Sequence, residues 1–260
     1  TMNESARYTF GTSPAAAERL RSIGDFFNPI ADMHIRRFVK TRPEVAIDLG
    51  CGPGFTTAML AGATRCRDTY GLDRSGEFLA GARQEFGQYT FLEHDVTQVP
   101  FPVTPDVMYC RFVRSHLKHP VEIINRWLTQ LQPRGFLFVD ELNDIDSRLP
   151  VFTTYLSMAE SIIAEQGAAL YVGETLSSGE YNAQVLLNEA TTIEVSDRKA
   201  ASWFLSNTKT IWRLNGYVHS RLSPGERQDI EHLLENIMTS RKTESHITWK
   251  LRRRIRISWC

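Results

Sequence analysis

Residues 45–54 of the chain read VAIDLGCGPG, a short apolar stretch that ends in an acid and continues with a glycine at every second position. The apolar stretch is typical of a buried β-strand, and residues 56–63 after the glycines have a helical pattern. Glycine tolerates positive φ and has no side chain to keep a ligand away from the backbone. We therefore expect a strand–turn–helix unit with a ligand bound over Gly50, Gly52 and Gly54.

Strand and helix patterns continue to alternate beyond this unit. The predicted strands cover residues 45–49, 69–73, 90–94, 107–111 and 135–140, and the predicted helices cover residues 56–63, 76–86 and 121–131. Such alternation is typical of βαβ units, which build a parallel sheet with helices on its faces. The pattern predicts a doubly wound α/β core.

The flanking segments are predicted to be mainly helical. Residues 13–40 have a helical pattern that Asn28-Pro29 is expected to break into two helices. We expect one domain over residues 1–260. Its predicted parts are an N-terminal helical cap at 1–40, a cofactor-binding core at 41–146, a helical lid inserted at 147–189, and strands and a helix at 190–260 that complete the sheet.

The last part of the chain contains two predicted types of element. Residues 191–195 and 199–203 have strand patterns, and residues 223–240 have a helical pattern that begins with a Ser223–Glu226 capping box and carries Leu233 in its apolar stripe. Residues 246–259 alternate apolar with mostly basic side chains, so we expect a strand with one buried face and one solvated basic face that includes Arg256.

Charge and cysteine content restrict the classes of partner. Thirty Lys and Arg balance 30 Asp and Glu, so no overall field favours nucleic acid or a membrane surface. The four cysteines lack the close pairs of zinc or dithiol motifs. We expect reduced thiols and a cytoplasmic location, since neither a secretory signal nor a long apolar span is visible.

The glycine turn differs from two other nucleotide-binding motifs. A dinucleotide fingerprint requires Gly-x-Gly-x-x-Gly, but Phe55 stands at the last position, and a P-loop requires Gly-Lys-Ser/Thr, which the chain lacks. Asp48 directly before the turn repels phosphate and favours a cationic ligand.

The segment Asp48-Leu49-Gly50-Cys51-Gly52-Pro53-Gly54 resembles the first motif of the class I S-adenosylmethionine-dependent methyltransferases. The likeness continues to about residue 145, through acids that end the next two predicted strands. The resemblance implies a mostly parallel seven-stranded sheet that binds S-adenosylmethionine and releases S-adenosylhomocysteine. It also implies a set of cofactor-binding residues: Asp48, Gly50, Cys51, Gly52, Gly54, Asp73, Arg74, Asp95, Val96, Cys110 and Arg111.

Two of these acids have defined partners in the family that the chain resembles. Asp73 matches the acid that accepts hydrogen bonds from both ribose hydroxyls. Asp95 matches the acid at the adenine amino group, and Val96 matches the residue that packs on the ring. The turn before the fifth predicted strand departs from the common Pro-Gly-Gly, because Arg134 occupies its middle position.

Methyl transfer from a sulfonium is an in-line displacement, so alignment supplies much of the acceleration and no metal is required.

His116 lies just past the fourth strand and is a candidate base, or a residue that packs or caps the next helix. Arg111 can hold an acceptor carboxylate or pair with a structural acid. Tyr8 can contact a cation through its ring face. Glu141, Tyr155 and Tyr171 are candidates for the acceptor pocket.

These features favour a methyltransferase that acts on N or O of a small metabolite bearing a carboxylate or an amine, as a monomer or homodimer, without a membrane partner. A nucleic-acid methyltransferase is one alternative, with the basic residues 250–256 on phosphates, although the neutral total charge speaks against it. A dinucleotide-dependent oxidoreductase is the alternative from another enzyme class.

Overall fold

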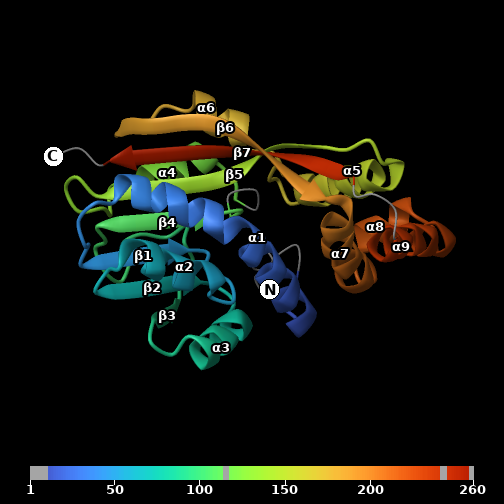
Figure 1. Cartoon of the computed structure of the whole chain (residues 1–260), viewed down its shortest axis with the longest axis horizontal. Helices are drawn as coiled ribbons and strands as arrows, with labels where there is room; N and C mark the ends of the chain where they lie inside the picture. The colour runs from blue at the N-terminus through green and yellow to red at the C-terminus, as the bar shows by residue number, and fades with distance from the viewer. Residues whose placement is uncertain (1–10, 114–116, 241–244, 258–260) are drawn as a thin grey trace, which may run out of the picture.

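The computed structural model describes residues 11–113, 117–240 and 245–257. At its centre is a seven-stranded sheet in the order β3-β2-β1-β4-β5-β7-β6 (Figure 1). The strands are β1 (Val45–Leu49), β2 (Asp68–Asp73), β3 (Thr90–Glu93), β4 (Val107–Arg111), β5 (Phe136–Asp146), β6 (Gln184–Ser196) and β7 (His246–Ile257). Strands β1 to β5 pair in parallel, and β7 is antiparallel to both of its neighbours. The predicted doubly wound, mostly parallel seven-stranded α/β fold is confirmed.

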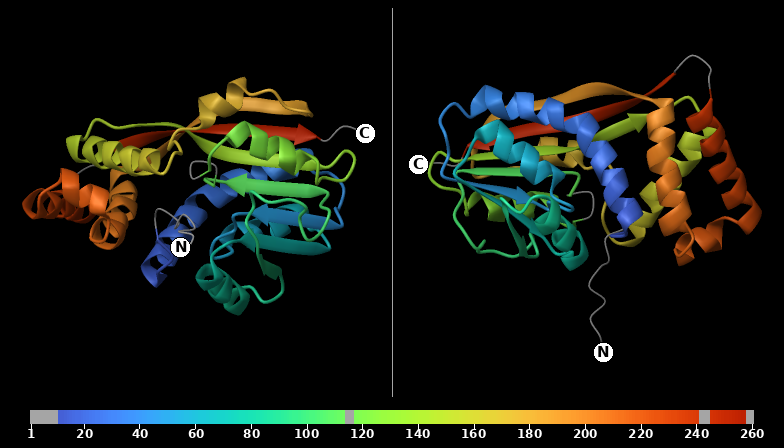
Figure 2. Two further views of the ribbon diagram at one scale, coloured as in Figure 1. Left: turned by 180° about the vertical axis from the view of Figure 1, so that it is seen from behind. Right: turned by 60° about the horizontal axis from the view of Figure 1, so that its bottom comes forward.

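Helices cover both faces of the sheet (Figures 1 and 2). The helices are α1 (Pro14–Phe38), α2 (Phe55–Thr64), α3 (Gly76–Glu85), α4 (Pro120–Leu128), α5 (Pro150–Glu165), α6 (Gly173–Ser178), α7 (Asp197–Asn207), the π-helical turn η2 (Thr208–Trp212), α8 (Gly216–Arg221) and α9 (Pro224–Thr239). Buried side chains of α1 and α2 pack on one face, against Tyr109 and Phe138. Those of α4 and α6 pack on the other face, against Ile47 and Met108. None of the helices in the described ranges is both long and apolar enough to cross a bilayer.

Helix α1 is continuous, so the predicted break at Asn28-Pro29 is wrong. Ser13 caps its start by accepting a hydrogen bond from the Ala16 amide, and Pro14 occupies the first turn. Proline inside a helix normally removes a hydrogen bond and kinks the chain. Here Phe27 before the proline and Ile35 after it are both almost fully buried, so tertiary packing holds the two halves as one helix.

The predicted strand at residues 199–203 is also wrong, because this segment belongs to helix α7. Ser196 ends β6 and caps α7 by accepting from the Lys199 amide. Residues 147–189 contain α5, α6 and the first residues of β6, which starts at Gln184.

Helices α5, α7, α8 and α9 pack together beside the long β6–β7 pair. The core between them, α1 and β7 contains a group of rings that we call the aromatic cluster: Phe27, Phe152, Tyr155, Trp203, Phe204, Trp212 and Trp249. The capping box between Ser223 and Glu226 is present at the start of α9. Leu233 is 49% exposed, so its predicted place in the buried stripe of this helix is wrong.

The basic residues of β7 are not all solvated, contrary to prediction. Arg256 is fully buried, and Arg253, which lies in the register of the apolar positions, is 2% exposed. The reason is the position of β7 inside the sheet, between β5 and β6. The Arg256 guanidinium lies 3.1 Å from the centre of the Tyr181 ring, and Arg252 bonds to Asn143 and Glu174. Arg252 and Arg256 of the predicted basic face therefore make contacts within the protein.

Candidate functional site

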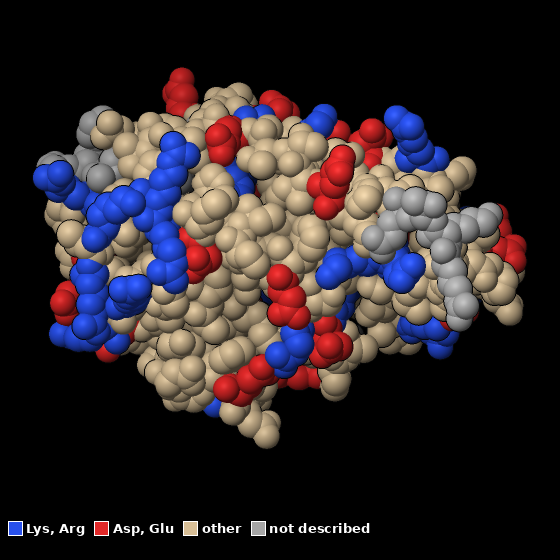
Figure 3. Space-filling model, in the orientation of Figure 1, with Lys and Arg blue, Asp and Glu red and all other residues tan. Residues whose placement is uncertain are grey.

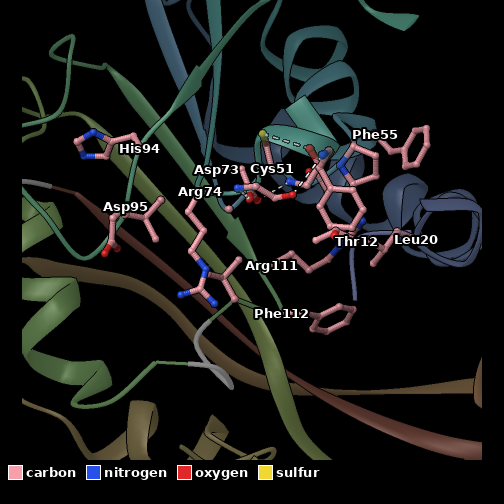
Figure 4. A pocket seen from close by; sticks show the side chains of 18 of the residues that line it. Thr12, Leu20, Cys51, Phe55, Asp73, Arg74, His94, Asp95, Arg111 and Phe112 are labelled. Atoms are coloured by element: carbon pink, nitrogen blue, oxygen red, sulfur yellow. Dashed lines mark hydrogen bonds between the residues drawn. The ribbon is translucent and has the colours of Figure 1, made fainter. Parts of the chain in front are cut away.

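A cavity of about 360 Å³ opens at the C-terminal ends of the parallel strands (Figure 4). The chain leaves β1 toward β2 on one side and returns to β4 on the other, so β1 and β4 form the switch point at which open α/β sheets bind ligands. Figure 4 shows His94 and Asp95 at one end of the cavity, and Thr12, Leu20 and Phe55 at the other.

The glycine turn forms one wall of this cavity. Gly50, Gly52 and Gly54 all have positive φ, and the amides of Gly50 and Cys51 donate to the Leu72 carbonyl oxygen. A Cβ on Gly50 would lie 2.4 Å from a methyl group of Val113, so no other residue fits there. A Cβ on Gly54 would meet the rings of Phe86 and Phe91, and Gly54 does not line the cavity. Gly54 therefore serves internal packing, whereas Gly50, Cys51 and Gly52 face the cavity.

Asp73 joins the glycine turn to the end of β2. Its Oδ2 accepts from the Gly52 amide at 2.8 Å, and its Oδ1 accepts from the Ser75 amide at 2.8 Å. Burial raises the pKa of this carboxyl, and the two backbone hydrogen bonds oppose the rise. Asp73 lines the cavity beside Arg74.

The loop after β3 supplies the other end of the cavity. Asp95 is exposed at the rim, where its Oδ1 accepts from the amide and hydroxyl of Thr97. Val96 is nearly buried, and its carbonyl oxygen accepts a hydrogen bond from the indole of Trp127 at 2.7 Å. The predicted residues Asp95 and Val96 therefore meet Asp73 and the glycine turn at one cavity.

Asp48 has a different position from the one its sequence motif indicated. It is 1% exposed and does not line the cavity. Its Oδ2 accepts from the hydroxyls of Thr56 and Thr57, at 2.5 and 2.8 Å, in the first turn of α2. Burial raises the pKa of Asp48 to about 6, against the opposing effect of these hydrogen bonds. The carboxyl therefore connects β1 to the start of α2 across the glycine turn, and it does not line the cavity.

The end of β4 forms the remaining wall. Arg111, Phe112 and Val113 all line the cavity. The Nη1 atom of Arg111 is buried, and no group in the described part of the chain forms a hydrogen bond with it. Cys110 points to the opposite face of the sheet, into the core with α4, and does not line the cavity. Arg111 thus presents an unsatisfied donor at the cavity wall, which an anionic group can satisfy.

Several predicted acceptor-pocket residues lie elsewhere. Tyr155 stacks on Phe204 at 4.1 Å in the aromatic cluster, and Tyr171 packs against the same core. Glu141 is fully buried behind the wall, where its Oε1 accepts from the Val113 amide. None of the three lines the cavity, so the prediction for them is wrong. His116 and Tyr8 lie outside the described residues.

The sequence analysis predicted an N-terminal helical cap, but it named neither the residues of α1 nor the two rings that line the cavity. Thr12, Leu20 and Ile23 line the cavity from the N-terminal side, with Phe55 and Phe112. The periodicity of Leu20 and Ile23 was visible in the sequence and fits core packing equally well, because both roles require an apolar helix face.

Comparison with known proteins supports the likeness seen in the motifs. A family model described as a methyltransferase domain matches residues 47–139. Trans-aconitate 2-methyltransferase of Methylobacterium nodulans is 31% identical over 137 residues, which cover 52% of this chain and 53% of that protein. The Yersinia pestis enzyme of the same name is 32% identical over 106 residues, or 41% of each chain. The chain spans about half the length of the curated relatives it matches.

Solved structures share the fold at low sequence identity. A methyltransferase-type protein from Bacillus halodurans has a TM-score of 0.56 at 10% identity, with 88% of this chain and 99% of that chain covered. Coclaurine N-methyltransferase, crystallised with N-methylheliamine and S-adenosylhomocysteine, has a TM-score of 0.53 at 14% identity, with 88% and 72% covered. Residues 47–139 thus match a methyltransferase domain, and in its motifs and strand order the chain is similar to the class I S-adenosylmethionine-dependent methyltransferases.

Proposed function

We propose that this chain transfers the methyl group of S-adenosylmethionine to an oxygen or nitrogen of a small molecule that carries a carboxylate. The observation that carries the proposal is the buried, unsatisfied Nη1 of Arg111 at the wall of the cavity. A guanidinium binds a carboxylate through paired, charge-assisted hydrogen bonds. Relatives named for methylation of trans-aconitate support an acceptor of this charge.

The cavity fits the cofactor of the family in size and chemistry. Its volume lies in the range of about 300–1,000 Å³ that small-molecule sites occupy. A Cβ on Gly52 would find no atom nearer than 3.8 Å, so the turn leaves open space for a ligand on this side. We assign Gly50, Cys51 and Gly52 to the methionine part, Asp73 and Arg74 to the ribose side, and Asp95 and Val96 to the adenine. S-adenosylmethionine supplies an activated methyl group on a sulfonium.

The residues of the chain orient the two reactants and exclude water. Leu20, Ile23 and Phe112 give the cavity an apolar boundary, which strengthens electrostatic interactions within it. Arg111 holds the acceptor by its carboxylate, so that the reacting atom is aligned for in-line displacement. His116 stays a candidate for removing a proton from the acceptor. Tyr8, in the predicted N-terminal cap, stays a candidate for contact with the sulfonium.

The charge distribution supports a nucleic-acid acceptor less well than a small carboxylate. Lys and Arg gather at the left of Figure 3, over the C-terminal end of α1. Basic residues in the last turn of α1 and just before β2 are paired, since Arg36 bonds to Asp32 and Arg67 to both Glu44 and Asp68. Glu44 precedes β1, whereas the cavity lies at the other end of the parallel strands.

A screen of acceptors with the purified chain tests the proposal. Mono-, di- and tricarboxylates, amines and short RNA and DNA are incubated with S-adenosylmethionine, and the release of S-adenosylhomocysteine is measured. We expect release with carboxylates, and a rise in acceptor KM of about 10- to 100-fold in Arg111→Gln, at unchanged affinity for S-adenosylhomocysteine. Failure to bind S-adenosylmethionine, or turnover of uncharged acceptors alone, would contradict the proposal.

A further inference from the structure

The backbone at Phe112, directly after β4, adopts a conformation that bulky residues rarely accept. Its φ is 55°, in the left-handed region that favours glycine. Phe112 lines the cavity between Arg111 and Val113, which line it as well. Strained backbone of this kind persists only where the surrounding structure holds it, and it concentrates at functional sites.

Neighbouring elements hold the turn at three points. The Phe112 amide donates to the Asp140 carbonyl oxygen at 3.1 Å. The Val113 amide donates to Oε1 of Glu141 at 2.9 Å. The Phe112 ring meets the Phe27 ring of α1 edge to face, with 5.5 Å between their centres. The turn is therefore fixed by β5 on one side and by α1 on the other.

Glu141 contributes the hydrogen bond to a side chain among these three contacts. The paired register of β4 and β5 ends at Arg111 and Asp140, so the regular ladder does not continue to the Val113 amide. Glu141 is the next residue of β5, is fully buried, and places its carboxyl at this amide. The side chain thus extends the β4–β5 connection beyond the last register pair, Arg111 and Asp140.

The position of Val113 matters for the cofactor side of the cavity. The Val113 methyl groups occupy the space in which a Cβ of Gly50 would stand. One end of the turn therefore contacts the glycine loop, while Arg111 at the other end faces the proposed acceptor. A displacement of the turn moves both walls of the cavity together.

We propose that Glu141 is a positioning residue for methyl transfer: through the Val113 amide it holds the left-handed turn at Phe112, which sets Arg111 toward the acceptor and Val113 against the glycine loop. This inference rests on the function proposed above. Glu141 itself does not touch the reactants, because it lies behind the wall that residues 111–113 form.

Three substitutions of Glu141 separate its possible contributions. Glu141→Gln keeps an acceptor oxygen at the same reach, Glu141→Asp keeps a carboxyl but shortens its reach, and Glu141→Met keeps the size but loses the acceptor. In Glu141→Asp and Glu141→Met we expect faster hydrogen exchange of the Val113 amide and a rise in acceptor KM of about 10-fold or more. We expect Glu141→Gln to stay within about threefold of the wild type in KM.

Asp144→Asn is the matched control, because Asp144 is an acid of the same strand that lies at the surface beside Lys250. It should leave KM and Val113 exchange unchanged. Hydrogen exchange of the Val113 amide and the affinity for S-adenosylhomocysteine are both measured without an acceptor. The role of Glu141 can therefore be decided even if no carboxylate is methylated. Wild-type exchange at Val113 in a folded Glu141→Asp or Glu141→Met protein overturns the inference, as does equal loss of function in Glu141→Gln.

Discussion

The cavity and the aromatic cluster use opposite kinds of interaction, although both lie against α1. The cavity is built from turns whose positions depend on hydrogen bonds between charged side chains and backbone, such as those of Asp73 to Gly52 and Ser75. The aromatic cluster is built from rings in direct contact, such as the stack of Phe204, Tyr155 and Trp212. We infer that ligand binding depends mainly on the first region and the free energy of unfolding mainly on the second.

The largest expected effect is in the aromatic cluster. Phe204 is 4% exposed and contacts both Phe152 and Tyr155. Phe204→Ala should lower the free energy of unfolding by about 3–5 kcal/mol, through lost burial and the cavity left behind. Thermal denaturation should show the loss, with S-adenosylhomocysteine affinity unchanged in the folded protein. Leu214→Ala is the control, because Leu214 is 89% exposed. A large loss of affinity in folded Phe204→Ala would show that the two regions are not separable.

Asp48 also tests the comparison, since it lies in β1 directly before the glycine turn but is expected to affect the free energy of unfolding. Its pKa in the folded chain is about 6, above the ordinary value of 3.8. The stability it contributes is therefore complete below the lower value and is lost as the pH rises through the higher one. At roughly 1.36 kcal/mol per pKa unit, the charged carboxyl costs about 3 kcal/mol at neutral pH.

Asp48→Asn should therefore raise the melting temperature above about pH 7, and the gain should shrink to nothing below about pH 4. Melting curves of both proteins across this pH range measure the difference. A constant gain at every pH would mean that the effect does not come from the titration of Asp48.

A substitution of Gly50 tests whether ligand binding depends on the conformation of the glycine turn. Gly50→Ala forces a side chain into the left-handed region and against Val113. We expect the turn of the ligand-free variant to move away and relieve this strain, so that restoring its conformation on binding costs about 2 kcal/mol, or about 30-fold weaker binding of S-adenosylhomocysteine in calorimetry. Gly62→Ala in α2 is the matched control, because a Cβ there meets no atom within 4 Å. Equal affinities of the two variants would show that the turn adapts.

The smallest effect is expected at the end of β2, where Asp73 bonds to the glycine turn. Asp73→Ala should weaken S-adenosylhomocysteine binding by about 10-fold or more, because hydrogen bonds to a charged group are lost. The melting temperature of the ligand-free protein should change less than in Phe204→Ala. Asp68→Ala, at the opposite end of β2, serves as the control. Unchanged affinity in Asp73→Ala would remove this acid from the proposed site.

The sequence was sufficient to predict those parts of the fold that depend on local turn residues and local periodicity. The glycine turn, the acids that follow two neighbouring strands and the β1–β5 order were all predictable, because a βα unit carries its own turn residues and periodicity. The roles assigned to Asp73, Asp95, His116 and Tyr8 stay predictions.

Several of the errors share one physical cause, which is packing between distant segments. Pro29 stays helical because both halves of α1 are buried, and Arg256 is buried because β7 enters the sheet interior. The contact of Glu141 with Val113 joins residues 28 positions apart in the chain. Neither periodicity nor turn chemistry indicates such a contact, since both describe only local preferences.

The place of β7 between β5 and β6 has a consequence for biosynthesis. A ribosome produces both neighbours of this strand before the strand itself, with the helices α7, α8 and α9 in the interval. Until residues 246–257 emerge, β5 and β6 each expose an unpaired edge, and such edges readily join those of other chains. We therefore expect the nascent polypeptide to be most prone to aggregation at this late stage of translation.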